Sequence, residues 1–420
     1  MINEQIILYK NNKGEFVPYD TENNEKVLLT GSKEEILKKV EEAIKNYYSK
    51  EKKPTVRRFI NKNTLIVKYD WKETLCNTEG KLLGNTFVSQ FIDGYVEHKW
   101  DWIPYQKYGE YGFMNIKTGE IRESNWLNVR PFKEGLAVVR DRQTNKYGYI
   151  NENLELVIPC EYDAVGNFSD SLAYVGILIS SKKQLKDPKI ALTKEDMDTI
   201  NRILNIRRDV LIFGFIDKTG KMVIPFSYKY VKDFSEGHAF VKTFDDYHSG
   251  FYIDKENKKT KRIWDENPTY FKNGVAYAKE YNHEKNGDHP MLYRLRIKNG
   301  KLFKEEIDID EYEAGTEAMK AGLFNKKEQG EYKILNKNDT DSRFIDGLYH
   351  NGEEVEIDLF GAAKNLIEEF LDNKTDDIIY EYDIRTNEIK PPREYIIGTR
   401  TTLEETEVKP YTRKRTLTNS

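Results

Sequence analysis

The sequence predicts an all-β repeat protein, in which tandem small antiparallel sheets form a curved solenoid or a propeller-like array with helical N-terminal, inserted and C-terminal elements. The first observation is a marker, an aromatic residue followed three positions later by Gly or Ser. Successive markers lie 41, 36, 66, 37, 41 and 32 residues apart, and the long step becomes 36 if one repeat carries an insertion of about 30 residues. The marker occurs at Phe91/Gly94, Phe132/Gly135, Phe168/Ser171, Phe234/Gly237 and Phe271/Gly274, and in weaker form at Tyr312/Gly315 and Phe344/Gly347.

The second observation is a polar turn, led by Asn or Asp, ahead of each of the first five markers. An Asx side chain hydrogen-bonds the backbone two residues on, and Gly or Asn accepts the positive φ of a tight hairpin. Runs of β-branched and aromatic residues flank these turns at strand length, as in Tyr147 to Ile150. The turns lie at Asn77 to Gly80, Asn115 to Gly119, Asn151 to Asn153, Asp217 to Gly220 and Asp254 to Asn257.

Each repeat is therefore expected to be a small hairpin followed by a third strand, such as Leu136 to Val139 or His238 to Val241. One such unit cannot bury its apolar face alone, so neighbouring units must pack into a continuous core. We expect the recurrent phenylalanines to fill that core and the glycines to serve backbone geometry. Both are therefore poor candidates for a functional site.

The order of these motifs matches a known repeat pattern. The matching motifs are the pairs Tyr111-Gly112, Tyr147-Gly148 and Phe213-Gly214, the strand ends Ile158-Pro159 and Ile224-Pro225, the pair Tyr162-Asp163, and the markers Phe132 to Val139 and Phe234 to Gly237. Together they resemble the WG repeat family, also called KWG repeats, although Tyr or Phe replaces the Trp that gives the family its name. The resemblance covers about residues 75 to 282. It implies an all-β repeat architecture and says little about activity.

Composition and charge limit the classes of function. The chain has 420 residues, of which 38% are hydrophobic and 33% charged, a composition that suits an array whose units contact only their neighbours. The net charge of -4 gives no reason to expect nucleic acid or an anionic membrane as a ligand. No run approaches the apolar length of a membrane span. Because Met1 to Leu8 lacks the basic region of a secretory signal, we expect a cytoplasmic protein.

Residues that carry chemistry do not combine into a recognisable site. Cys76 and Cys160 lie in strand-like runs of different repeats and are expected to be buried small hydrophobes. Among six histidines, only His283 and His289 are spaced like ligands, and no third ligand completes the pair. The acidic run Asp308 to Glu311 is expected to form a solvated strand edge. Without a phosphate-binding loop, a nucleophile elbow or a zinc signature, we expect no enzyme, no cofactor and no metal.

Helices are predicted at both ends of the array. Ser32 and Glu35 form a capping box ahead of an apolar stripe, which is expected to be an N-terminal cap or, alternatively, a docking helix. The helix Asp358 to Asp372 is expected to be a C-terminal cap or a dimerising face. The predicted domains are an N-terminal hairpin and capping helix (1–70), the repeat array (71–350), a C-terminal helix and hairpin (351–400) and a flexible basic tail (401–420).

The segment 177–210, inserted in the third repeat, is the first candidate for partner binding. It contains a helix start at Thr193, after which Met197 and Ile200 begin an apolar stripe. Arg207 and Arg208 follow near the helix C-terminus, where cations suit the dipole. Insertions within repeats map to one face, which is often the binding face. The alternative is a surface decoration whose stripe packs on the array.

An aromatic group around Trp100, Trp102 and Tyr105 is the second candidate, and its residues look exposed. Rows of aromatic rings stack on sugars, so this group supports carbohydrate or cell-wall binding as an alternative function. Otherwise these rings seal the contact between two repeats.

The predicted function is a non-enzymatic protein-binding scaffold, whose protein partner is engaged through loops and the inserted helix. The 28 tyrosines provide amphipathic contact residues for such a role. The second alternative is a nucleic-acid-associated accessory protein, which would bind through Lys52, Lys53, Arg57 and Arg58 or through the tail.

Overall fold

The computed structural model describes most of the chain, which forms two compact units. Unit 1 is Met1–Gln90, Ile116–Glu120 and Lys326–Ser420, and unit 2 is Phe91–Asn115 and Ile121–Asn325. Unit 1 thus combines the two ends of the chain, which the sequence analysis placed in separate segments. The described residues are 5–10, 16–18, 26–48, 54–69, 72–92, 100–206, 208–245, 248–265, 267–280, 290–320, 328–329, 332–335, 347–351, 353–376, 380–384, 387–390 and 395–399.

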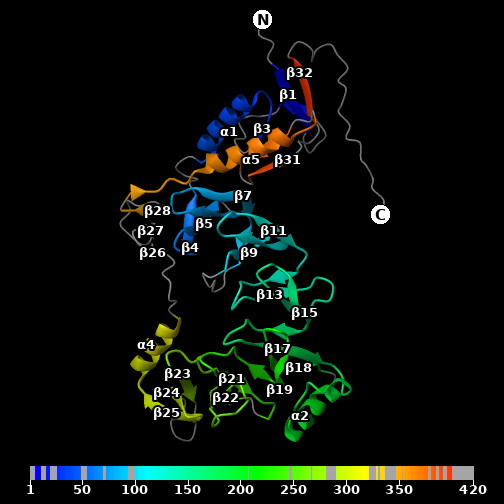
Figure 1. Ribbon diagram of the computed structural model, residues 1–420, viewed down its shortest axis with the longest axis vertical. Coiled ribbons are helices and arrows are strands. Elements are labelled where there is room, and N and C mark those ends of the chain that lie inside the picture. Colours follow the sequence, from blue (N-terminus) through cyan, green and yellow to red (C-terminus); the bar gives the residue numbers. More distant parts are fainter. Residues whose placement is uncertain are drawn as a thin grey trace. The chain divides into compact units, whose positions relative to one another are not determined.

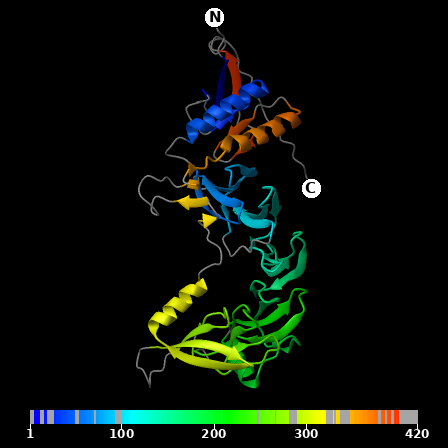
Figure 2. The same ribbon diagram turned by 60° about the vertical axis from the view of Figure 1, so that its left-hand side comes forward.

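Two helices of unit 1, α1 (Lys33–Tyr47) and α5 (Leu359–Asn373), lie side by side (Figures 1 and 2). The predicted capping box of α1 is confirmed, because Ser32 Oγ accepts the Glu35 N–H and Glu35 Oε2 accepts the Ser32 N–H. Asp358 caps α5 as expected, accepting the Gly361 N–H at 2.8 Å. The apolar stripes of the two helices share one buried cluster, so α1 covers the stripe that was a candidate dimerising face.

The sheets of unit 1 also join the chain's ends. The predicted N-terminal hairpin is confirmed as β1 (Gln5–Lys10) and β2 (Phe16–Pro18), and β1 pairs on its other side with β32 (Tyr395–Thr399). A second sheet combines β3 (Lys26–Leu28) with the hairpin β30 (Glu381–Asp383) and β31 (Glu388–Lys390). The other strands are β4 (Thr55–Phe59), β5 (Thr64–Tyr69), β6 (Lys72–Asn77) and β7 (Leu82–Val88), and β26 (Glu328–Gln329), β27 (Tyr332–Leu335), β28 (Gly347–His350) and β29 (Glu353–Glu354).

Unit 2 is a series of small antiparallel sheets that follow one another along the chain (Figure 1). None of the sheets in the described residues closes into a barrel. The sheets are β8 (Gln90–Phe91), β9 (Trp102–Lys107), β10 (Glu110–Asn115) and β11 (Ile121–Ser124); β12 (Asn128–Val129), β13 (Ala137–Arg140), β14 (Tyr147–Ile150) and β15 (Leu156–Tyr162); β16 (Ala164–Val165), β17 (Leu172–Ile179), β18 (Val210–Asp217) and β19 (Met222–Tyr228); β20 (Tyr230–Val231), β21 (Ala239–Lys242) and β22 (Phe251–Ile253); and β23 (Ala276–Glu280), β24 (Met291–Lys298) and β25 (Lys301–Ile307).

The sequence repeat and the structural sheet are out of phase. In the repeat that opens at Tyr147, β14 and β15 complete one sheet, whereas β16 and β17 begin the next. The expectation that a hairpin and its third strand form one module is therefore wrong, although the strands themselves are present. Because each repeat contributes to two sheets, the chain itself links every sheet to its successor.

A pair of aromatic rings ties consecutive sheets together. In four repeats the first strand places a ring against the marker phenylalanine 19 residues later, as Tyr149 does with Phe168 at 4.9 Å between ring centroids. Tyr149 lies in β14 and Phe168 in the connection between β16 and β17, so the ring pair packs one sheet on the next. The five predicted core phenylalanines are all at most 3% exposed, which confirms their structural role. The other ring pairs are Phe113/Phe132, Phe215/Phe234 and Tyr252/Phe271.

The markers are tight turns with two left-handed residues, as Glu134 (φ 49°) and Gly135 (φ 91°) illustrate. This is the backbone of a type I′ hairpin turn, which explains the preference for Gly at the marker's last position. The Gly of the opening pair has another cause, because a Cβ on Gly148 would lie 2.4 Å from the Ile158 carbonyl oxygen. A side chain at position 148 would therefore prevent the close approach of β15 to β14.

A ladder of carboxylates connects successive marker turns. The Glu134 carboxylate accepts the Ser171 N–H of the next turn at 2.9 Å, and Asp170 accepts the Gly237 N–H at 2.6 Å. Glu236 continues the series by accepting the N–H groups of both Asn273 and Gly274. The acidic residue at the third marker position therefore satisfies backbone donors of the following repeat.

The end of the array departs from the sequence prediction. The weak marker Tyr312/Gly315 lies in a helix, α4 (Ile309–Lys320), so it is not a repeat turn. The acidic run was expected in a strand, but Asp308 accepts the Glu311 N–H at 2.8 Å and starts this helix. Residues Phe344, His283 and His289 lie outside the described residues.

Candidate interaction surface

The aromatic group at β9 is buried, so the expectation of an exposed patch is wrong. Trp100, Trp102 and Tyr105 are 8%, 9% and 2% exposed. The reason is position, because β9 lies between β8 and β10 and has no free edge. Both tryptophans pack into a cluster with Phe113 and Phe132. These rings seal the contact between two sheets, which was the alternative reading of the sequence.

The inserted helix, α2 (Lys194–Asn205), packs its apolar stripe on the array. It begins at Thr193 as predicted, and the Thr193 side chain accepts the Asp196 N–H at 3.1 Å. Ile200 is fully buried, and Met197 is partly buried and packs against the same cluster, so the array covers most of the stripe. Arg208 is exposed, and Arg207 lies outside the described residues.

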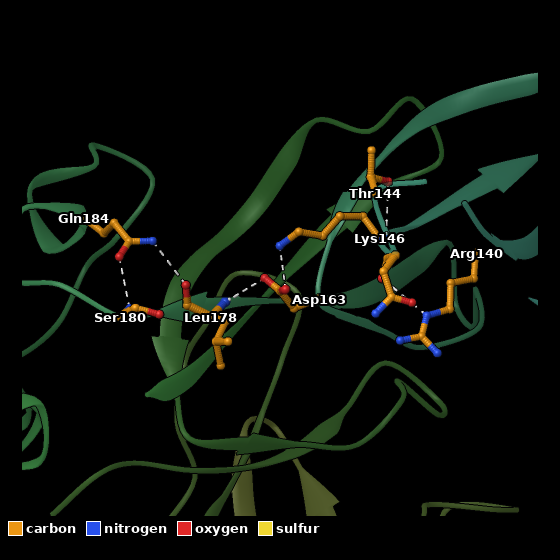
Figure 3. A network of polar contacts seen from close by, with 8 residues as sticks. Arg140, Thr144, Lys146, Asp163, Leu178, Ser180 and Gln184 are labelled. Atoms are coloured by element: carbon orange, nitrogen blue, oxygen red, sulfur yellow. Dashed lines mark hydrogen bonds and ion pairs between the residues drawn. The ribbon is translucent and has the colours of Figure 1, made fainter. Parts of the chain in front are cut away.

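Polar contacts fasten the insertion to the sheets at both of its ends. At its start, Asp163 accepts Lys146 Nζ on one side and the Leu178 N–H on the other, while Gln184 donates to the Leu178 carbonyl (Figure 3). Within α2, the buried Asp196 accepts the Phe244 N–H at 2.8 Å. Asp163 is the aspartate of the Tyr162-Asp163 motif, so the motif's acid joins the insertion to the preceding sheet.

Between these anchors, the insertion pairs with the outer edge of β19, the edge that faces away from β18. The Phe226 N–H donates to the Lys189 carbonyl at 2.9 Å, and the Ala191 N–H donates to the Phe226 carbonyl at 3.0 Å. Ile190 and Phe226 form a parallel bridge. The segment Lys189–Ala191, which follows a 3-10 turn at Gln184–Lys186 within the insertion, therefore covers backbone groups that an edge strand otherwise leaves open.

The corresponding strand of the preceding repeat, β15, has no such cover. Within the described part of the chain, no segment pairs with the edge of β15 that faces away from β14. Leu156 and Val157 on this strand are 48% and 41% exposed. Cys160 occupies the position that Phe226 occupies in β19, 66 residues later. We call this side of β15, from Leu156 to Glu161, the open edge.

Comparison with known proteins supports the equivalence of the two strands. The family model described as WG containing repeat matches residues 147–177 and 213–246, which include β15 and β19 respectively. The chain carries WG repeats. We call the segment 147–177 the first matched WG repeat and 213–246 the second. No curated protein matches the sequence.

Solved structures resemble the chain only distantly. Kluyvelomyces marxianus Hsv2 is 8% identical over 61% of this chain and 84% of that chain, with a TM-score of 0.33. A chain of the mitotic checkpoint complex is 8% identical over 59% and 76%, with a TM-score of 0.31. Streptogramin B lyase is 10% identical over 61% and 84%, with a TM-score of 0.27.

Other edges of unit 2 differ from the open edge of the first matched WG repeat. The edge of β22 is covered by a returning segment, in which the Thr260 N–H donates to the Tyr252 carbonyl. Strand β11 has four residues, of which Arg122 and Glu123 are charged, and β25 carries four charged residues among its seven. Short length and charge are common protections of edge strands. Of the seven residues of β15, only Glu161 is charged, so this edge is largely apolar as well as open. Pro159 removes one N–H from the strand, as Pro225 does from β19, which nevertheless pairs with the insertion.

The two matched WG repeats also differ in charge beside these edges. Glu155 and Glu161 are exposed at the ends of β15, whereas Lys221 and Ser227 occupy the same positions around β19. Burial raises the pKa of the Cys160 thiol to about 11, so the thiol is protonated near neutral pH and is a weak nucleophile. The open edge therefore combines apolar side chains, backbone hydrogen-bonding groups and flanking negative charge.

Two charged groups of the second matched WG repeat have perturbed pKa values, and burial is the cause in both. Burial raises the pKa of the Asp233 carboxyl to about 6, and its Oδ1 atom has no hydrogen-bond partner in the described structure. Burial lowers the pKa of Lys232 to about 8, and its ammonium donates to the Pro268 carbonyl. The described residues contain no group of three or more His, Cys, Asp or Glu side chains arranged to hold a metal ion.

Two of the basic residues considered for nucleic acid, Arg57 and Arg58, lie among the described residues, and only Arg57 is exposed. Arg57 pairs with Glu73 at 2.8 Å, and Arg58 is 7% exposed. Lys52, Lys53 and the tail 401–420 lie outside the described residues. None of the helices that the structure describes is long and apolar enough to cross a membrane.

Proposed function

We propose that the protein is a non-enzymatic protein-binding scaffold built from WG repeats, and that its partner docks on the open edge of β15. The observation that carries this proposal is the contrast between two equivalent strands, one covered by the chain itself and one apolar and not covered by any described residue. An uncovered apolar edge strand invites pairing with another chain, and proteins normally protect such edges. Addition of an extended segment to a sheet edge is a recurrent mode of protein recognition.

This proposal moves the binding surface away from the inserted helix. The apolar stripe of α2 is buried against the array, and the insertion itself protects β19. We therefore assign the insertion a structural role. The burial of Trp100 and Trp102 removes the basis for a carbohydrate site, and the burial of Arg58 weakens the basic patch considered for nucleic acid.

Site-specific cross-linking tests the proposal with an internal control. Val157 and Val223 occupy the same position in the two matched WG repeats and are equally exposed, at 41% each. A photo-reactive amino acid at position 157 is expected to capture a discrete protein from the native cell lysate, and the same amino acid at position 223 is not. Capture at position 157 should be competed by untagged wild-type protein and not by V157K. Equal capture from both positions, or from neither, would contradict the proposal.

A further inference from the structure

The molecule contains a template for what binds the open edge. We infer that β15 receives an extended peptide segment in parallel pairing, with an apolar residue opposite Cys160 and basic residues beside Glu155 and Glu161. This inference rests on the proposed function and specifies its partner by chemistry. The template is the segment Lys189–Ala191, which already occupies the equivalent edge of β19.

The backbone geometry of the template defines the pairing. On β19, one residue, Phe226, both donates its N–H and accepts through its carbonyl, and the two partners are Lys189 and Ala191. Parallel pairing of this kind leaves the intervening residue, Ile190, with its own backbone groups directed away from the strand. The Ile190 N–H is instead bonded to the Asp187 carbonyl within the insertion. The same two hydrogen bonds are expected at Cys160.

The side chains indicate an apolar residue at the centre of the ligand. In the template, Ile190 and Leu192 pack against the cluster that contains Phe226. On β15 the smaller Cys160 replaces that phenylalanine and is only partly buried, so a ligand side chain has room beside it. Leu156 extends the apolar surface along the strand. It is 48% exposed, whereas its counterpart Met222 packs against the core.

Two carboxylates beside the open edge favour basic residues in the rest of the ligand and disfavour a second copy of this chain as the ligand. Glu155 and Glu161 are both exposed and flank the apolar part of β15, so basic residues on either side of the central apolar residue are complementary. Pairing of β15 with β15 of another copy would bring these carboxylates together without a counter-charge. A basic and apolar segment of a different protein therefore fits better.

A synthetic peptide based on Lys186 to Leu192, with Asp187 replaced by Asn and Leu192 by Lys, is a suitable probe, because it keeps the template's backbone register and central isoleucine and places lysines on both sides of that isoleucine. A fluorescent form of the peptide is titrated with the full chain and followed by anisotropy. Binding is expected to be saturable. Methylation of the peptide nitrogen at the Ala191 position removes the donor and should weaken binding about fivefold. The matched control methylates the nitrogen at the Ile190 position and should leave the affinity unchanged.

Protein variants locate the binding site. Glu161→Lys should weaken binding about threefold to tenfold by reversing the charge beside the open edge, whereas Ser227→Lys, the same position on the covered strand, should leave it unchanged. If both methylated peptides bind as tightly as the parent while position 157 still cross-links a partner, the strand-pairing inference fails and the proposed function stands. If the peptide and the cross-linking both fail, both are wrong. Self-association of the wild-type chain that the peptide disrupts would replace the basic segment with a second copy and overturn the inference.

Discussion

Two WG repeats of one chain share a pattern, a strand order and a core, yet they differ at the outer edge of their hairpins. On the second matched repeat, the edge of β19 is hydrogen-bonded to the insertion through Phe226. On the first, β15 presents Leu156 and Val157 at an edge that no described segment covers. The difference teaches that a repeat motif specifies strands and turns, while a segment outside the motif decides whether the resulting edge is available.

Substitutions in the insertion that covers β19 are expected to destabilise the protein most. Ile200 is fully buried on the face of α2 that packs on the array, so Ile200→Ala is expected to lower the free energy of unfolding by about 3 kcal/mol through lost apolar burial and a residual cavity. The matched control is Ile206→Ala at the end of the same helix, where the side chain is 65% exposed. Urea denaturation measures both variants. Equal losses would show that the stripe does not fasten the insertion.

A second test concerns Asp233, whose counterpart in the first matched repeat is Asn167. Burial raises the carboxyl pKa to about 6 in the folded chain, from the ordinary 3.8. Between about pH 4 and pH 6 the folded state therefore holds a proton that the unfolded state has released, and stability falls as the pH rises through this window.

Asp233→Asn should remove this pH dependence and stabilise the protein above pH 6 by about 1 to 3 kcal/mol, the size that such a pKa difference implies. The measurement is the difference in unfolding free energy between variant and wild type at pH 4.5 and at pH 7.5. A difference that does not change with pH would contradict the buried state of this carboxyl.

The marker turns are the feature in which the two repeats are alike. Asp170 and Glu236 occupy the same position and each accepts N–H groups of the next turn. Asp170→Ala and Glu236→Ala are therefore expected to lower stability by similar amounts, about 1 kcal/mol each. Glu256→Ala is the control, since Glu256 is highly exposed and pairs only with a neighbouring lysine among the contacts described here. A loss confined to one of the two turns would break the equivalence.

The smallest effect on stability is expected at the exposed valines. Val157→Lys and Val223→Lys should each change the unfolding free energy by less than about 0.5 kcal/mol, because both side chains already face solvent. The two variants should differ in partner binding, which only Val157→Lys reduces. Thermal melts test stability, and each variant is used as the untagged competitor in the cross-linking at position 157. A large loss of stability in either variant would show that the valine is part of the core.

Much of the fold was predictable from local pattern. The steps between markers located a 30-residue interruption, and residues 180–209 do separate β17 from β18. The phenylalanine markers predicted core residues and Ser32 predicted a helix cap, because both signals lie in short stretches of sequence. The phase between repeat and sheet was not predictable, because β14 is joined by a short turn to β13 as well as to β15, and the repeat pattern does not say where one sheet ends.

The candidate surface was harder to predict for the same reason. Leu156 to Tyr162 and Met222 to Tyr228 look alike in sequence, and only the path of the insertion distinguishes them. Trp100 and Trp102 looked exposed because they lie among polar residues, but β9 is an inner strand. Scarcity of charge does not distinguish the two strands, because β15 has one charged residue and the covered β19 has none.

Amide hydrogen exchange of the unliganded full chain tests the central claim most directly. The account predicts strong protection of the Phe226 amide, which the insertion holds, and exchange of the Cys160 amide that is faster by on the order of a hundredfold. Equal protection of the two amides would mean that the edge of β15 is already occupied, and it would contradict the account.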